Sequence, residues 1–139
     1  ARLKPHCCIA VDVTWASDAP GTNPNDTGEV KLGGGPVLCM GSAVNKPMNA
    51  LLKQVAEELD MKVQWEIAGG RTGTDGDTVN QADEGIPMAL VSIPLRYMHS
   101  SVEVGSWKDI EDCVRLLSTF LVRLSQELDK GFDFCPVRP

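Results

Sequence analysis

The sequence has few cations and no long apolar run, and both absences exclude classes of partner. Lys and Arg total 13 against 19 Asp and Glu, which leaves a formal net charge of −6. A nucleic-acid-binding protein needs a basic face to displace counterions from phosphates, so the charge argues against nucleic acid as a partner. The longest apolar-rich stretch, residues 87–95, is about half as long as a bilayer span requires. No membrane segment is predicted.

The five cysteines include no Cys-x-x-Cys pair, so their spacing fits neither a zinc knuckle nor a secreted disulfide framework. Cys113 and the adjacent pair at 7 and 8 lie inside apolar patterns, where a reduced cysteine behaves as a small hydrophobe. The first residues, ARLKP, contain neither an initiator Met nor the apolar core of a signal peptide. We therefore expect a reducing, cytoplasmic compartment, and a chain that is a fragment or a processed product.

Motifs for phosphate binding, calcium binding and serine catalysis are also absent. The glycine-rich residues 69–77 match neither a P-loop nor a dinucleotide fingerprint. A calcium loop beginning at Asp75 fails because Val79 and Asn80 stand where an acid or amide and then a glycine are required. There is no G-x-S-x-G elbow. Residues 69–77 are therefore predicted to form a tight turn between a strand and a helix.

The chain length of 139 residues predicts one domain, residues 1–139, in which strands and helices alternate. Two apolar runs suit strands that are buried on both faces, as in a parallel sheet, and the order of elements predicts an α/β layered domain. A long loop, 14–35, separates the first strand from the second, and loops of this length are often functional. The predicted strands are 7–13, 36–40, 61–67 and 88–95, and the predicted helices run from Pro47 to Leu59, over 78–83 and from Ser106 onward.

The last predicted helix has the clearest local pattern. Ser106 can cap it, and Asp109 is placed to interact with the exposed amides of the first turn. Apolar residues then recur at helical spacing and predict one buried face. That face comprises Ile110, Cys113, Val114, Leu117, Leu121 and Leu124.

Two polar residues stand at the predicted carboxyl ends of strands, where open α/β sheets bind their ligands. Asp12 ends the first apolar run, and a carboxylate there needs a metal, a cation or amide donors. The alternative is an aspartate that caps the following turn. His99 follows the strand 88–95, where a neutral imidazole could bind zinc, manganese or cobalt. The alternative for His99 is an ordinary surface histidine.

An ordered set of short motifs resembles one known family over roughly residues 7–125. The motifs are residues 10–14 (AVDVT), 16–21 (ASDAPG), 73–75 (GTD), 93–100 (IPLRYMHS) and 102–103 (VE). Together they resemble the carboxyl-terminal half of the metal-dependent glutamyl/leucyl aminopeptidases, the group that contains the tetrahedral aminopeptidases and the proteins once labelled cellulase M. Ser101, where the family more often has proline, and Arg71 and Gly76 in the glycine-rich turn depart from its usual pattern.

The resemblance implies a three-layer α/β/α sandwich with a mostly parallel sheet, and a site that holds two divalent metal ions, zinc or cobalt or manganese. It maps one metal ligand onto Asp12 and a ligand of the other metal onto His99. The bridging aspartate, a second histidine, a glutamate ligand and the glutamate general base of the family come from preceding segments, and no such segment is present in these 139 residues. The implied reaction is hydrolysis of amino-terminal residues from peptides by a metal-activated water.

Three further residues are substrate-binding candidates under the same resemblance. Thr74 and Asp75 lie in the turn that resembles one near the family's substrate, although a purely structural turn is the alternative. Arg96 either pairs with Asp75 or meets substrate.

The resemblance leaves two interpretations of the whole chain. In the first, the chain is the carboxyl-terminal part of an aminopeptidase, inactive by itself, with a peptide substrate, the missing amino-terminal half and further copies of itself as partners. In the second, it is a stand-alone, non-catalytic binding module that retains the fold. Either way, a sheet without its upstream strands should expose an apolar edge.

Overall fold

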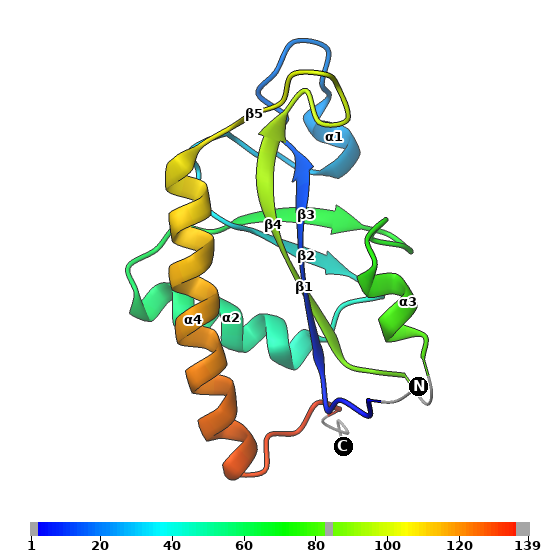
Figure 1. Ribbon diagram of the computed structural model, residues 1–139, viewed down its shortest axis with the longest axis vertical. Coiled ribbons are helices and arrows are strands. Elements are labelled where there is room, and N and C mark those ends of the chain that lie inside the picture. Colours follow the sequence, from blue (N-terminus) through cyan, green and yellow to red (C-terminus); the bar gives the residue numbers. More distant parts are fainter. Residues whose placement is uncertain (1–2, 83–84, 136–139) are drawn as a thin grey trace.

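The computed structural model describes residues 3–82 and 85–135, which form a layered α/β arrangement (Figure 1). Strands and helices alternate along most of the chain, as the sequence predicts. The strands are β1 (Cys8–Trp15), β2 (Val37–Gly41), β3 (Gln64–Ala68), β4 (Met88–Arg96) and β5 (Val104–Gly105). The helices are α1 (Pro24–Thr27), α2 (Lys46–Glu58), α3 (Gly76–Asn80) and α4 (Trp107–Asp129).

The sheet consists of two parallel strand pairs joined by a short antiparallel contact. Its order is β1-β4-β2-β3, with β5 added antiparallel to β4. β1 pairs with β4 over eight residues and β2 pairs with β3 over five, both in parallel. β2 and β4 run antiparallel and pair only at Val37–Ser92 and Leu38–Val91. The two strand pairs therefore cross at a large angle, as Figure 1 shows.

The sheet has two faces that are covered by different helices, because successive side chains of a strand point to opposite sides. The core face carries Leu38, Ala89 and Val91, which pack in one cluster with α2 and α4. The cleft face carries Met88 and Leu90 in a second cluster, and α3 lies on this side. The predicted α/β/α layering is confirmed, with α3 as a small third layer.

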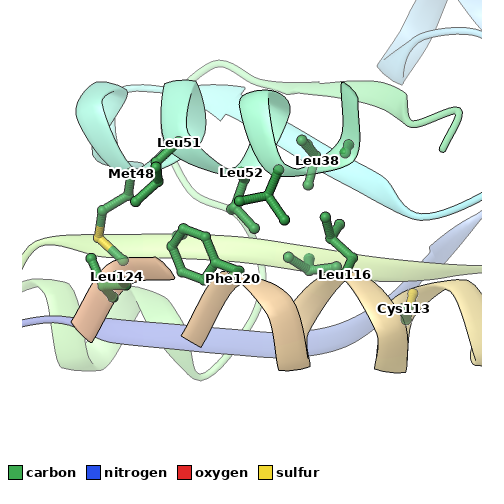
Figure 2. Packing of buried hydrophobic residues seen from close by; sticks show 12 residues of the cluster. Leu38, Met48, Leu51, Leu52, Cys113, Leu116, Phe120 and Leu124 are labelled. Atoms are coloured by element: carbon green, nitrogen blue, oxygen red, sulfur yellow. The ribbon is translucent and has the colours of Figure 1, made fainter. Parts of the chain in front are cut away.

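The main core lies between α2, α4 and the core face of the sheet (Figure 2). Pro47 stands in the first turn of α2 as predicted, and the Asn45 side chain caps that turn by accepting from the Met48 amide at 3.1 Å. In Figure 2, Phe120 of α4 projects toward Leu52 of α2. Burial of these large side chains supplies most of the stabilisation of the layer.

The predicted apolar face of α4 is partly wrong. Leu116 and Phe120, which are not in the predicted set, are fully buried, whereas Val114 is 59% exposed and Leu121 is 54% exposed. Cys113 and Leu124 are buried as predicted. α4 carries apolar residues on more than one side, so helical spacing alone selects the wrong stripe.

The start of α4 also differs from its prediction. Ser106 is the N-cap residue, but its side chain makes no capping hydrogen bond. Asp109 lies in the first turn as predicted, but it is completely buried, and its carboxylate accepts hydrogen bonds from the amides of Gly33 at 2.7 Å and Gly35 at 2.9 Å. Asp109 therefore ties the long loop before β2 to the helix.

Strand β1 is an outer strand of the sheet and is less buried than predicted. In the described part of the chain it pairs with β4 alone, and Val11 is 53% exposed. The prediction of burial on both faces is thus wrong for β1, while it holds for Met88–Val91 of β4, which are all buried. The unpaired side of β1 agrees with the expectation that the sheet exposes an edge.

Smaller differences concern the ends of the elements. β3 begins at Gln64, three residues after the predicted start at Met61, and the loop 14–35 contains the short helix α1. α3 covers Gly76–Asn80, two residues before the predicted start, while the predicted end at Asp83 lies outside the described residues. None of the described helices is both long enough and apolar enough to cross a membrane.

Candidate active-site cleft

A cleft of about 490 Å³ opens on the cleft face of the sheet and collects most of the polar residues singled out by the sequence. Its walls come from β1, from β3 and the turn after it, and from the turn after β4. The residues that matter to its chemistry are Asp12, Thr14, Glu66, Thr74, Ser92 and His99. A polar cleft at this end of parallel strands is the expected ligand site of an open α/β sheet.

Asp12 lies on β1 and points to the cleft face. It is the register partner of Ser92 on β4, and β1 continues for three residues beyond it. Its carboxylate accepts the amide of Val13 at 2.8 Å, a bond that leaves further lone pairs for a ligand. This hydrogen bond runs to the next residue of the strand and not to a following turn, and Asp12 also lines the cleft.

His99 stands in a strained turn directly after β4. Its φ is 63°, and that of Tyr97 is 58°, so two residues that are not glycine occupy the left-handed region within three positions. Such strain is concentrated at functional sites. The imidazole is edge-on to Trp15 at 5.9 Å between ring centroids, and the backbone amide donates to Glu103 at 2.7 Å. These contacts hold an exposed imidazole at the rim of the cleft.

The glycine-rich turn, residues 69–75, is organised by Asp77 rather than by Asp75. The Asp77 carboxylate accepts from Thr72 and from the amide of Gly73, at 2.8–3.0 Å. Partial burial would raise the pKa of Asp77, but these hydrogen bonds, with the nearby Arg71, hold it below its ordinary value. Thr74 lines the cleft, whereas the cleft lining does not include Asp75, which is exposed.

Arg96 pairs with Asp18, not with Asp75. Its guanidinium donates to both carboxylate oxygens of Asp18, at 3.0 and 2.7 Å. This bidentate pair holds the pKa of Asp18 below its ordinary value, with some help from the amide of Leu32. Pairing with Asp75, one of the two predicted roles, is thus corrected. Arg96 connects the end of β4 to the loop before β2, and the cleft lining does not include it.

Glu66 is the cleft residue that sequence reasoning missed. It lies on β3, and its carboxylate accepts from the hydroxyl of Thr14 on β1 and from that of Ser92 on β4 at 3.0 Å. These partners are 52 and 26 residues away along the chain, so no local pattern connects them. In the sequence, the one indication that Glu66 lies near the cleft is its place in a predicted strand that leads into the glycine-rich turn.

Cys39 also lines the cleft, but its raised pKa leaves little of the reactive thiolate at neutral pH. Burial, together with the charge of Glu66, raises its pKa to about 11. Burial likewise raises the pKa of Cys113 to about 11. We expect iodoacetamide at pH 8 to label the exposed Cys135 first and to leave both buried thiols unmodified until the protein unfolds, as measured by peptide mass mapping. Rapid labelling of Cys39 in the folded protein would contradict this assignment.

The cleft contains the types of ligand that bind a divalent metal, but too few of them to hold one. A carboxylate and an imidazole are the ligand types that zinc, cobalt and manganese accept. Yet residues 3–82 and 85–135 contain no group of three or more His, Cys, Asp or Glu side chains that could hold a metal ion. A metal site that uses Asp12 and His99 therefore needs ligands from outside the described residues.

Comparison with known proteins identifies the family. The model of the M42 glutamyl aminopeptidases matches residues 1–116. The chain belongs to the M42 glutamyl aminopeptidase family. The family resemblance of the short motifs is confirmed by this match, which contains both Asp12 and His99.

Several M42 relatives show how much of the family's chain is present. A lysyl aminopeptidase from Pyrococcus furiosus is 35% identical over 96% of this chain and 36% of its own. A TET aminopeptidase structure from a marine sediment Thaumarchaeota archaeon has a TM-score of 0.81 and 30% identity, covering 93% of this chain and 36% of that one. A PhTET1 structure with a dodecamer in the asymmetric unit has a TM-score of 0.64 and 25% identity, covering 84% of this chain and 34% of that one. The chain thus spans about a third of the length of these relatives.

Proposed function

We propose that this chain is the carboxyl-terminal portion of one M42 aminopeptidase catalytic domain, which releases amino-terminal residues from peptides. The observation that carries the proposal is that Asp12 and His99, 87 positions apart in the sequence, line the same cleft at the ligand-binding edge of the sheet. In this proposal each holds one of two divalent metal ions, zinc or cobalt or manganese. When bound, the two ions supply Lewis acidity for the scissile carbonyl and a water of lowered pKa.

The residues of this chain then have distinct roles. The Asp12 carboxylate and the His99 imidazole act as ligands, and the strained turn at Tyr97–His99 keeps the imidazole at the rim. Thr74 lines the cleft and stays a substrate-binding candidate, with its hydroxyl hydrogen-bonded to the Thr72 hydroxyl at 2.9 Å and accepting from the Gly76 amide at 3.2 Å. Asp75 and Arg96 stay weaker substrate-binding candidates, because the cleft lining does not include them. The remaining ligands and the general base come from outside this chain.

Location and assembly follow as further parts of the proposal. All five cysteines are free thiols, which supports a reducing, cytoplasmic compartment. The dodecameric relative supports a homo-oligomer. The unpaired side of β1 is where a further strand of the same domain would add to the sheet.

The test compares the 139-residue chain with the full-length natural polypeptide that contains it. Both are assayed on a panel of aminoacyl p-nitroanilides, with and without zinc, cobalt or manganese, and with an N-acetylated substrate as a control. We expect hydrolysis by the longer polypeptide alone, lost on chelation and absent with the blocked substrate. Hydrolysis by the short chain would contradict its incompleteness. A longer polypeptide that is inactive with every metal would favour the non-catalytic binding module.

A further inference from the structure

Glu66 makes a contact that spans the whole sheet. Its carboxylate bonds the hydroxyls of Thr14 and Ser92, whose residues are 8% and 1% exposed. Buried hydroxyls need partners, and a carboxylate that accepts from both satisfies them with charge-assisted hydrogen bonds. The contact joins β3 to β4 and β1, across the intervening strand β2.

Both partners of Glu66 are neighbours of Asp12 on the cleft face. Thr14 lies two positions after Asp12 on β1, so the two side chains share a face. Ser92 is paired with Asp12 across the β1–β4 ladder, which places it on that face too. The carboxylate of Glu66 therefore anchors the two positions that flank Asp12.

The same contact bridges the short antiparallel junction between the two strand pairs. The β1–β4 pair and the β2–β3 pair are joined by only two antiparallel residue pairs, Val37–Ser92 and Leu38–Val91. The cleft is divided between them, with Asp12 on one strand pair and Thr74 after the other. A change in the crossing angle of the pairs would alter the distance between these two walls (Figure 1).

We propose that Glu66 is a positioning residue, which fixes the crossing angle of the two strand pairs and thereby the placement of Asp12 relative to Thr74. It acts through the hydroxyls of Thr14 and Ser92 and not through a contact with substrate or metal. Its effect on catalysis rests on the proposed aminopeptidase function, whereas its effect on the sheet does not.

The decisive comparison is Glu66→Leu against Glu66→Gln, with Glu57→Leu on the exposed side of α2 as the matched control. A glutamine amide can accept from one hydroxyl and donate to the other, so it keeps both ties without the charge. Leucine has a similar size and keeps neither. In the full-length polypeptide we expect Glu66→Leu to weaken zinc affinity and kcat by about 10- to 100-fold, the range for residues that orient metal ligands. We expect Glu66→Gln to retain most of both, and its pH profile to superimpose on that of the wild type.

Two kinetic results for the Glu66 variants would overturn the proposal. Equal losses in Glu66→Gln and Glu66→Leu would show that Glu66 acts through its charge, and an unaffected Glu66→Leu would show that the tie is unimportant. If Glu66→Leu does not fold, the double variant Thr14→Val with Ser92→Ala removes the same two bonds from the other side and is expected to reproduce its losses. Wild-type kinetics and zinc affinity in that double variant would equally refute a positioning role for the two hydrogen bonds to Glu66.

A structural readout separates this proposal from the proposed function. Residual dipolar couplings of the 139-residue chain report the orientation of β1–β4 relative to β2–β3. We expect a changed orientation in Glu66→Leu and the wild-type orientation in Glu66→Gln and Glu57→Leu. If the wild-type enzyme proves inactive, the proposed function fails while this comparison still decides the role of Glu66. An unchanged orientation in Glu66→Leu would refute it.

Discussion

Replacing Asp109 with alanine is expected to lower the free energy of unfolding by about 3 kcal/mol, because the substitution removes charged hydrogen bonds and leaves buried amides without an acceptor. Asp109 is completely buried, and its two bonds to Gly33 and Gly35 are the link between α4 and the loop before β2. Urea denaturation followed by far-UV circular dichroism measures the change. The free energy of unfolding of Asp109→Asn should lie between those of the wild type and Asp109→Ala, because the asparagine amide retains one acceptor oxygen.

The control for this prediction is Asp129→Ala on the same helix. Asp129 is exposed at the carboxyl end of α4, where an acidic side chain interacts unfavourably with the helix dipole. Its removal should leave stability unchanged or slightly increased. An Asp109→Ala variant as stable as Asp129→Ala would contradict the role of Asp109 in holding the loop.

The second large effect concerns catalysis by the full-length polypeptide. Asp12→Ala and His99→Ala should each reduce kcat/KM by more than about 100-fold, because removal of a direct metal ligand costs more than removal of an outer partner. Bound metal, measured by inductively coupled plasma mass spectrometry after dialysis, should fall in parallel. Both variants should remain folded, since Asp12 makes one local hydrogen bond and His99 is exposed.

His6→Ala and Asp129→Ala serve as matched controls, because they remove the other histidine and an exposed acid away from the cleft. Both should keep wild-type activity and metal content. Full activity in Asp12→Ala or His99→Ala would place the metal site elsewhere. Loss of activity with unchanged metal content would instead make the residue a substrate contact.

Features with strong local patterns could be predicted from the sequence. The helix that begins near Pro47 and the buried strand 88–95, which follows Pro87, have long apolar patterns, and both are present as α2 and β4. The α/β class follows from the alternation of such elements. Asp12 and His99 could be predicted because Asp12 stands near the end of one strand pattern and His99 follows another. The motifs around both residues also resemble the M42 family.

Features that depend on distant contacts could not be predicted. Asp109 stands where a helix start usually places an acid, and only the fold shows that its carboxylate faces Gly35 instead. Glu66 has no local signal, since its partners lie on other strands. The exposure of Val11 depends on the position of β1 in the sheet, which hydrophobic pattern does not encode.

The central claim is that Asp12 and His99 hold the metal ions of an M42 aminopeptidase site that residues outside this chain complete. An anomalous difference map at the zinc edge, from crystals of the full-length polypeptide, tests it most directly. We predict peaks in the cleft, one about 2.0–2.2 Å from a carboxylate oxygen of Asp12 and another about 2.0–2.1 Å from an imidazole nitrogen of His99. Zinc bound at other residues, with neither side chain in contact with a peak, would contradict the claim.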